Sequence, residues 1–411
     1  MVRFIHTADL QLILSPGAPD VRRAIQEARF ETLTRIMEVA REREVDFVAI
    51  CGDIFEDGLV SDETVHRAVR IFSDAAPMPV YIIPGNHDPL TPMSVYRHDA
   101  FRTAGENVAV LKTPDPVPVT DECALYPCPV LEKRSIYDPT AVIPPRAGTD
   151  GIRIGLAHGA LMIPDKYQPD DHPIPLDAAA QRGLDYLALG HHHSRYVEGN
   201  RIAYPGTPEQ TAFDDTDAGC VLLVTIDGPG VAPKLESIEV GTLRWLMWDR
   251  ELTEPVAEAL DALRAETDAL DCRDRTLLRL RLTGTLHADS MAQIEQLEAW
   301  LNPLGFLRAE VRVDIGLIEK LAGKLKALAE SDEVIAGAIT DLQRLADLDG
   351  PVDEAAEVPP RSTEELMALW NDAQLRDNEE TLKRHTEGLT AADAANAALL
   401  ALAGCAREVE P

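Results

Sequence analysis

The segment 80–88, VYIIPGNHD, is the stretch of sequence that decides the fold. Its apolar start, 80–84, is rich in β-branched and aromatic residues and predicts a buried strand. A glycine ends this run, and the polar residues Asn86, His87 and Asp88 follow directly. Ligands of open α/β sheets bind beyond the carboxyl ends of the strands. The segment therefore predicts a strand that carries functional side chains at its end.

The same arrangement recurs from the N-terminus to about residue 240. Short apolar runs alternate with amphipathic stretches, which is the pattern of β-α-β units. Ionisable side chains follow the apolar runs, and glycine precedes Asp53, Asn86 and His191, as expected where the backbone comes close to a ligand. The expected strands are 3–8, 46–50, 80–84, 108–112, 152–157, 186–189, 201–204 and 221–226, and the expected helices are 21–44 and 61–75.

The rest of the chain predicts a small α+β unit and a helical tail. Strand-like and helical stretches alternate again over 243–314. Apolar residues at three- and four-residue spacings predict a helix over 316–348, an acidic linker with two prolines follows over 349–360, and Ser362 and Thr390 begin two further helices. Such an apolar stripe is more often packed inside a protein than offered to a partner. We expect domains over 1–242, 243–315 and 316–411.

Charge and composition narrow the classes of function. The chain has 39 basic and 70 acidic residues, a net charge of −31. Such a field repels nucleic acid at long range, so any contact with DNA should be local or assisted by a partner. No run of about eighteen apolar residues and no signal peptide is apparent, which predicts a cytoplasmic protein with no membrane contact. The six cysteines form no C-x-x-C pair, so neither disulfides nor a thiolate zinc site is expected.

The residue types at the strand ends favour metal chemistry. Carboxylates, an amide and imidazoles that converge can hold two divalent cations with one aspartate bridging, a pair that clamps both oxygens of a phosphoryl displacement. The alternative is structural: Asp9 and Asp53 as turn or cap residues, and 191–193 as a solvated polar loop. We interpret His6 as a core or second-shell histidine, and His172 and the arginines of 21–44, Arg29 among them, as surface residues.

Taken together and in order, these motifs identify a resemblance. Asp9-x-Gln11, Gly52-Asp53, GNHD at 85–88, His158 and GHHH at 190–193 resemble the pattern of the calcineurin-like metallophosphoesterases. Within that superfamily, HTADL at 6–10, GDIF at 52–55 and YPGTP at 204–208 resemble the SbcD-type DNA repair exonucleases. The resemblance covers about 1–315, and the C-terminal helices match only by position.

The resemblance implies a fold and a site. The fold would be an α/β protein with a two-sheet β sandwich flanked by helices, a small α+β cap and a helical C-terminal tail. His87 would contact the scissile phosphate and help to protonate the leaving oxygen, and Asp88 would orient His87. The first metal site would consist of Asp9, Gln11, Asp53 and His193, and the second of Asp53, Asn86, His158 and His191. Two Mn²⁺ ions are expected, with Fe²⁺, Zn²⁺ and Mg²⁺ as alternatives.

The function implied is metal-dependent hydrolysis of DNA ends, as the nuclease subunit of an SbcC-like ATPase of the SMC type that binds the C-terminal helices. The resemblance also allows the protein to form a homodimer. One alternative is a phosphodiesterase for cyclic nucleotides or other small substrates, which the net charge favours and the predicted cap opposes. Another alternative is a non-catalytic scaffold. It is suggested by Gln11, which replaces a family histidine, and by Phe55-Glu56-Asp57, which stands where some relatives have a second histidine.

Overall fold

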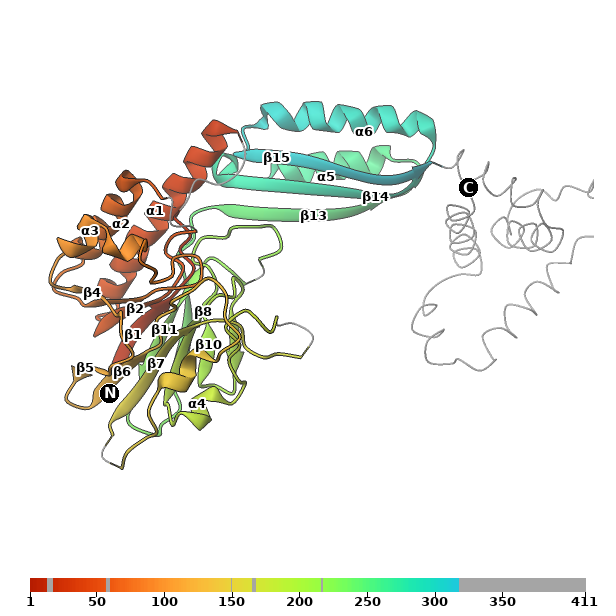
Figure 1. Cartoon of the computed structure of the whole chain (residues 1–411). Coiled ribbons are helices and arrows are strands. Elements are labelled where there is room, and N and C mark those ends of the chain that lie inside the picture. The colour runs from red at the N-terminus through yellow and green to blue at the C-terminus, as the bar shows by residue number, and fades with distance from the viewer. Residues whose placement is uncertain (13–17, 57–59, 149, 165–167, 216, 318–411) are drawn as a thin grey trace, which may run out of the picture. The chain divides into compact units, whose positions relative to one another are not determined.

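Six stretches of the chain are described by the computed structural model: 1–12, 18–56, 60–148, 150–164, 168–215 and 217–317 (Figure 1). The predicted tail lies outside the described residues, apart from its first two. Gly316 and Leu317 belong to a strand, so the helix predicted from about 316 to 348 does not include these two residues, and the rest of it lies outside the described residues. In the described part of the chain no helix is long and apolar enough to cross a membrane.

The first sheet is mixed, with six strands in the order β12-β11-β1-β2-β3-β4. Strands β1 to β4 are parallel, so their carboxyl ends meet at one edge, and β11 pairs antiparallel with β1. The strand bounds are β1 Val2–Thr7, β2 Phe47–Cys51, β3 Val80–Ile83, β4 Val108–Val110, β11 Cys220–Ile226 and β12 Lys234–Glu239.

The second sheet is also mixed and has the order β5-β6-β7-β8-β10-β9. Its central strands β6, β7, β8 and β10 are parallel, and the edge strands β5 and β9 run antiparallel to their neighbours. The strand bounds are β5 Val117–Thr120, β6 Cys123–Pro127, β7 Ile152–His158, β8 Tyr186–Gly190, β9 Tyr196–Glu198 and β10 Ile202–Tyr204.

The strands of both sheets are buried on both faces, so successive residues of a strand point into different apolar layers. There are three such layers, one between the sheets and one on the outer face of each sheet. Ile5 and Val48 face α1 (Pro19–Glu42) and α2 (Asp62–Asp74), which cover the outer face of the first sheet (Figure 1). Their neighbours Phe4 and Phe47 stack with ring centroids 4.7 Å apart in the core between the sheets. The outer face of the second sheet packs on α4 (Ala178–Gln181). The predicted two-sheet sandwich flanked by helices is confirmed.

The third sheet has the order β13-β14-β15, with α5 and α6 running along it (Figure 1). Leu260 and Leu263 of α5 and Ile294 and Leu297 of α6 are buried. The strand and helix order predicted for 243–314 is therefore confirmed. The bounds are β13 Arg244–Leu252, α5 Ala257–Asp268, β14 Thr276–Leu286, α6 Ala288–Leu301 and β15 Arg308–Leu317.

The described residues divide into two compact units, one within 1–248, 271–279 and 302–310, and the other with 249–270, 280–301 and 311–317. The domain boundaries expected from the sequence stay predictions. Short helical elements complete the first unit: α3 Asp99–Arg102 and single 3₁₀ turns at Val95–Arg97, Pro139–Val142, Arg273–Arg275 and Asn302–Leu304.

All predicted strands and both predicted helices of the first 240 residues are present, with bounds shifted by one or two residues. The Ser61 side chain caps α2, accepting from the Thr64 amide at 3.2 Å. The strands that the sequence analysis missed are β5, β6, β9 and β12. Three of these are edge strands with partly exposed side chains, so their apolar pattern is weak.

Candidate metal centre

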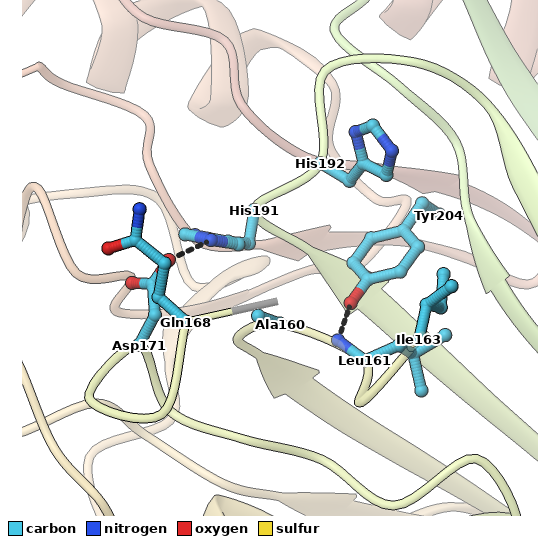
Figure 2. A pocket seen from close by; sticks show the side chains of 8 residues that line it. All are labelled: Ala160, Leu161, Ile163, Gln168, Asp171, His191, His192 and Tyr204. Atoms are coloured by element: carbon cyan, nitrogen blue, oxygen red, sulfur yellow. Dashed lines mark hydrogen bonds and ion pairs between the residues drawn. The ribbon is translucent and has the colours of Figure 1, made fainter. Parts of the chain in front are cut away.

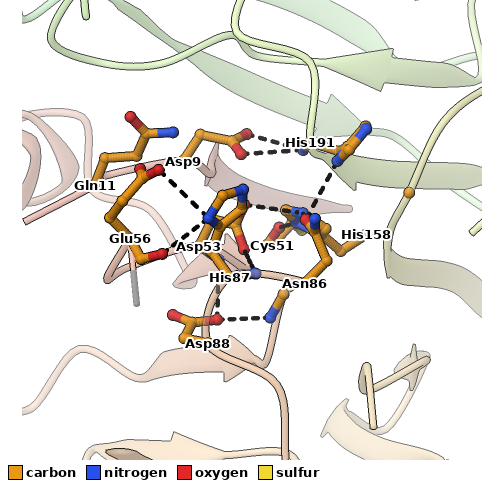
Figure 3. A network of polar contacts seen from close by, with 12 residues as sticks. Asp9, Gln11, Cys51, Asp53, Glu56, Asn86, His87, Asp88, His158 and His191 are labelled. Carbon is orange, nitrogen blue, oxygen red and sulfur yellow. Dashed lines mark hydrogen bonds and ion pairs between the residues drawn. The ribbon is translucent and has the colours of Figure 1, made fainter. Parts of the chain in front are cut away.

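The predicted ligands lie beyond the carboxyl ends of parallel strands. Asp9 follows β1, Asp53 follows β2, Asn86 follows β3, and His158 and His191 lie at the ends of β7 and β8. The topology of both sheets therefore brings residues up to 182 positions apart in the sequence to one place, as the contact between His191 and Asp9 shows (Figure 3).

Backbone strain is concentrated here. Asp9, Gln11, Asp53 and His191 have positive φ angles of 54°, 46°, 53° and 113°. Positive φ is uncommon for residues other than glycine, costs of the order of 1–3 kcal/mol each, and clusters at functional sites. Four of the seven predicted ligands therefore have a strained backbone. This strain lowers the stability of the loops and sets the direction of these side chains.

Two glycines allow the loops to approach one another. Gly52 has a φ of +86°, and a Cβ at this position would lie 2.4 Å from His158 Nδ1. A Cβ at Gly85 would lie 2.2 Å from Asp53 Oδ1. The expectation that glycine precedes these ligands because the backbone comes close is confirmed.

The most tightly clustered ligands are Asp9, Asp53 and His158, whose ligand atoms all lie within 4.8 Å of one another. His158 Nδ1 lies 2.8 Å from the Cys51 carbonyl oxygen. A carbonyl only accepts, so Nδ1 carries a hydrogen and Nε2 is left to face Asn86 Oδ1 at 2.7 Å and Asp53 Oδ2 at 3.3 Å. Nε2 is therefore aimed among the oxygen ligands.

Electrostatics in this cluster are those of a cation site. Burial alone would lower the pKa of His158, but Asp53 and Asp9 outweigh burial and raise that pKa to about 10. Burial raises the pKa of Asp9, and His158 opposes that shift. The buried imidazole thus lies beside two aspartates that favour a positive charge on it. A divalent cation bound at this position would replace the Nε2 proton.

His191 is held from two sides. Its backbone N–H donates to the Asp9 carboxylate at 3.0 Å. Its Nδ1 lies 3.3 Å from Asn86 Oδ1, and its Nε2 lies 2.8 Å from Asp171 Oδ2. A carboxylate on the outer nitrogen fixes the orientation of a metal-binding imidazole. Sequence reasoning missed Asp171, because nothing marks an acidic loop residue as the partner of a particular histidine.

The remaining pair of predicted ligands contact each other. Gln11 Nε2 donates to His193 Nε2 at 2.8 Å. The other ring nitrogen, Nδ1, lies 3.2 Å from Thr211 Oγ1 and 3.7 Å from Asp215 Oδ1. Burial would raise the pKa of Asp215, but its hydrogen bonds with His193 and Thr211 lower it to about 2. Gln11 is thus placed beside His193 as predicted, and Asp215 is a second missed carboxylate.

The predicted catalytic pair is arranged differently from expectation. The His87 backbone N–H donates to Asp53 Oδ1 at 2.9 Å, which ties His87 to the cluster. Its ring Nδ1 lies 2.8 Å from the Glu56 carbonyl oxygen and 3.4 Å from the Glu56 carboxylate (Figure 3). The carboxylate that contacts the His87 ring therefore belongs to Glu56, where the resemblance implied Asp88.

Asp88 instead joins the two loops that carry Asp53 and Asn86. Its buried carboxylate accepts from Tyr96 Oη at 2.7 Å and from backbone N–H groups of both loops, those of Asp53, Ile54, Phe55 and Gly85, at 2.8–3.3 Å. Burial and the nearby Asp53 raise the pKa of Asp88 to about 6. Its role in the structure is to fix the loops.

Three further interpretations can be checked. His6 is buried, with its ring nitrogens 3.0 Å from Tyr186 Oη and 3.1 Å from the Leu189 carbonyl, so its assignment to the core is confirmed. His172 and Arg29 are buried, so the expectation of surface positions is wrong for both. Arg29 Nη1 donates to the Gln11 carbonyl at 2.5 Å, which a helical pattern of mixed charges does not reveal.

A cavity of about 210 Å³ lies beside His191 (Figure 2). Tyr204 Oη accepts from the Leu161 amide at 2.8 Å and donates to the Gly159 carbonyl at 2.6 Å, which fixes one wall. The lining residues are Ala160, Leu161, Ile163, Gln168, Asp171, His191, His192 and Tyr204. The cavity is large enough to hold one small chemical group beside the predicted metal ligands.

The donor set fits divalent cations. Carboxylate and amide oxygens with imidazole nitrogens suit Mn²⁺, Fe²⁺ and Zn²⁺, and the oxygens alone suit Mg²⁺. The five cysteines in the described part of the chain are free and none is among these ligands. The site is thus a candidate dinuclear centre for hydrolytic chemistry.

Comparison with known proteins places this centre in a class. Residues 2–195 match the family model of the calcineurin-like phosphoesterases. This part of the chain therefore forms a calcineurin-like metallophosphoesterase domain, a class that uses a dinuclear metal site.

Individual proteins similar to this chain give a more detailed comparison than the family does. The DNA double-strand break repair protein Mre11 of Methanopyrus kandleri is 30% identical over 281 residues, which cover 61% of this chain and 58% of that protein. The uncharacterized metallophosphoesterase YhaO of Bacillus subtilis is 27% identical over 252 residues, 55% of this chain and 58% of that one. The SbcD component of the nuclease SbcCD of Escherichia coli is 24% identical over 287 residues, 58% of this chain and 67% of that one. The matched regions span little more than half of the first two relatives.

Proposed function

We propose that this protein is a metal-dependent phosphodiesterase that hydrolyses DNA at its ends and works with an SbcC-like ATPase. The observation that carries the proposal is the convergence of Asp9, Asp53 and His158 within 4.8 Å, with His87 tied to the same aspartate. The likeness to Mre11 and to the SbcD component of SbcCD supports DNA as the substrate.

The side chains have distinct roles in this reaction. Two divalent cations at these ligands would supply a nucleophile at neutral pH and stabilise charge on the phosphoryl oxygens. Asp53 would be the ligand shared by the two cations, which is supported by its contacts with His158 Nε2, 3.3 Å from its Oδ2, and with the His87 amide, 2.9 Å from its Oδ1. As the bond from phosphorus to the leaving oxygen breaks, His87 in its imidazolium form would give its Nε2 proton to that oxygen and become a neutral imidazole with its hydrogen on Nδ1.

The charge of the chain sets a condition on this function. A net charge of −31 opposes the approach of DNA, so the polymer has to be delivered by a partner or gripped locally. We propose that the partner binds the segment 316–411. Deletion of 361–411 should then abolish complex formation with the ATPase while hydrolysis of a small phosphodiester persists.

A second candidate keeps the chemistry and changes the substrate. The cavity of about 210 Å³ beside His191 and the negative charge both favour a small phosphodiester such as a cyclic nucleotide. In a third candidate, a non-catalytic scaffold, Gln11 in place of histidine has removed activity. The metal content and the substrate range separate the three.

The deciding experiment compares end-labelled linear duplex with closed circular DNA in Mn²⁺, with and without an SbcC-like ATPase, and with Asp53→Asn as the inactive control. Degradation of the linear duplex supports the proposal. Hydrolysis of cyclic nucleotides alone favours the second candidate. Loss of all hydrolysis, including that of bis-p-nitrophenyl phosphate, favours the scaffold.

A further inference from the structure

We propose that the loop 131–137 is a docking surface for a single-stranded end of nucleic acid, with Tyr137 as the ring on which a base stacks and Lys133 and Arg134 as contacts to the phosphates. The loop follows β6 and has the sequence LEKRSIY. The inference rests on the proposed function, because it names the form of the substrate.

The loop exposes several large apolar side chains in a short segment. Leu131, Ile136 and Tyr137 are 61%, 64% and 73% exposed. Single apolar residues are ordinary on a protein surface, whereas several together mark a site of contact with another molecule. Three of the seven residues of this loop are therefore available for such a contact.

The first end of the loop adjoins the segment that carries His87. Val130, the residue just before the loop, donates its backbone N–H to the Pro84 carbonyl at 3.3 Å. The Val130 carbonyl accepts from the Leu90 amide at 2.8 Å. Pro84 and Leu90 lie on either side of the GNHD segment, so the loop 131–137 begins directly beside these predicted site residues.

The middle of the loop is fixed to the segment that orients His191. Ser135 donates its backbone N–H to the Asp170 carbonyl at 3.0 Å, and its carbonyl accepts from the His172 amide at 2.9 Å. Asp171, between these two partners, contacts His191 at 2.8 Å. The loop thus lies at the rim of the candidate metal centre, tied to two of the segments that form it.

The charge of the loop is opposite to that of the chain. Lys133 and Arg134 against the single acid Glu132 give the loop a net charge of +1, in a chain with a net charge of −31. Lys133 is exposed, and its ammonium has no ion pair with any residue that the structure describes. Arg134 pairs with Asp170 at 2.8 Å, and the two side chains are 70% and 44% exposed. Exposed pairs contribute little stability, so a phosphate can replace Asp170 as the partner of Arg134.

The apolar side chains favour a single strand over a duplex. In a duplex the base faces are stacked on one another, and a loop meets mainly phosphates and sugars. An unpaired end offers free base faces, which stack on a tyrosine ring whatever their sequence. A protein partner is the alternative, because tyrosine and arginine are also enriched at protein interfaces. The cations and the position beside the predicted ligands favour the nucleic acid.

The test measures binding of a fluorescein-labelled oligothymidylate by fluorescence anisotropy, with the full-length protein and without added metal, so that the strand is not cleaved. The wild type should bind this strand more tightly than a blunt duplex of the same length. Tyr137→Ala should raise the Kd for the strand about tenfold, in the lower part of the range for loss of one stacked base. Tyr137→Phe keeps the ring and should leave the Kd within about twofold of wild type.

The salt dependence of binding separates the cation from the ring. Lys133→Gln should raise the Kd about threefold and reduce the slope of log Kd against log salt by about 0.7, the contribution of one phosphate contact on a single strand. Tyr137→Ala should leave this slope unchanged, because stacking releases no counterions. If Tyr137→Ala does not fold, the slope of Lys133→Gln decides.

Matched controls come from exposed residues outside the loop. Val231 is 43% exposed, and Lys234 on β12 is 74% exposed and pairs with Asp227. Val231→Ala and Lys234→Gln should change neither the Kd nor the slope. Melting temperatures check that every variant is folded.

Three results would overturn the inference. The first is a wild type that does not bind the oligothymidylate, and the second is an equal loss for strand and duplex in Tyr137→Ala. The third is an unchanged Kd in folded Tyr137→Ala with loss of binding to an SbcC-like ATPase, which would assign the loop to a protein partner. Hydrolysis of bis-p-nitrophenyl phosphate by the wild type in Mn²⁺ tests the proposed function separately, because this small substrate needs no strand contact.

Discussion

The two halves of the proposed metal centre differ in how firmly their imidazoles are held. In the half formed by Asp53, Asn86, His158 and His191, each imidazole has a partner 2.8 Å away on its outer nitrogen, and His158 is fully buried. In the half formed by Asp9, Gln11, Asp53 and His193, the imidazole is 33% exposed and its carboxylate partner, Asp215, lies at 3.7 Å. Since outer-shell partners orient ligands, we expect the first half to bind its cation more tightly.

The largest effect should come from removing the residue shared by both halves. Asp53→Asn keeps the size and shape of the side chain and removes the negative charge that would be shared by the two cations. Phosphodiesterase activity should fall by at least about 10³-fold, because metal binding supplies several kcal/mol of transition-state stabilisation. Metal content measured by plasma mass spectrometry should fall in parallel, and the rise in melting temperature on adding Mn²⁺ should vanish.

The matched control is Asp227→Asn, which removes an exposed carboxylate paired with Lys234 at 2.8 Å. It should keep both metals and full activity. Two bound metals in Asp53→Asn would contradict the bridging role and remove the basis for comparing the halves.

Much of this centre could be predicted from the sequence, for a physical reason. The ligands follow strands whose apolar runs are strong, and parallel strands bring their ends to one edge, as for Asp53 after β2 and Asn86 after β3. Glycine before each marks the close approach. The pattern thus predicts which residues meet, although it contains no distances.

A second prediction separates the halves. His158→Ala should weaken binding of the tightly held cation by more than about 100-fold, the upper end of what loss of an outer-shell partner does. His193→Ala should leave that cation bound and remove only the weaker one. Isothermal titration with Mn²⁺ in both variants, with circular dichroism to check folding, measures the two constants. Equal losses in both variants would show that the halves do not differ.

The partners of the ligands could not be predicted. Asp171 and Asp215 lie in loops without periodicity, and their roles arise only when the second sheet brings them to His191 and His193. Glu56 stood out in the sequence only as a departure from some relatives, and its contact with His87 appears only in the structure. Arg29 looked like one more arginine on a solvated helix, yet it donates to the Gln11 carbonyl. Tertiary contacts of this kind leave no local signal.

These partners provide a third, smaller test of the comparison. Asp171→Asn should weaken metal binding about tenfold, the lower end of the outer-shell range, because His191 loses its charged partner at 2.8 Å. Asp215→Asn should have a smaller effect, since its contact with His193 is 3.7 Å long. Mn²⁺ dissociation constants from electron paramagnetic resonance give the order. A larger effect at Asp215 would reverse our ranking of the halves.

The smallest expected effect is a gain, and it comes from repairing the weaker half. In the wild type the Gln11 side-chain amide donates a hydrogen bond to His193 Nε2 at 2.8 Å. This is the nitrogen that would face a cation. An amide oxygen is also a weaker ligand than imidazole for transition metals. Gln11→His should therefore strengthen binding of the second Mn²⁺ about tenfold, equivalent to ~1.4 kcal/mol, and raise phosphodiesterase activity at limiting Mn²⁺.

The backbone favours this substitution, because Gln11 has a φ of 46° and histidine is among the residues enriched in that region. Titration with Mn²⁺ and then Zn²⁺ should show the larger gain for Zn²⁺, which prefers nitrogen donors more strongly than Mn²⁺. Gln181→His, a change at an exposed position of α4 whose side chain donates to Asp177 Oδ1 at 2.7 Å, is the matched control and should alter neither constant. If Gln11→His is folded and binds both metals as the wild type does, the Gln11 amide already serves the second cation, and the two halves differ in rigidity without differing in affinity.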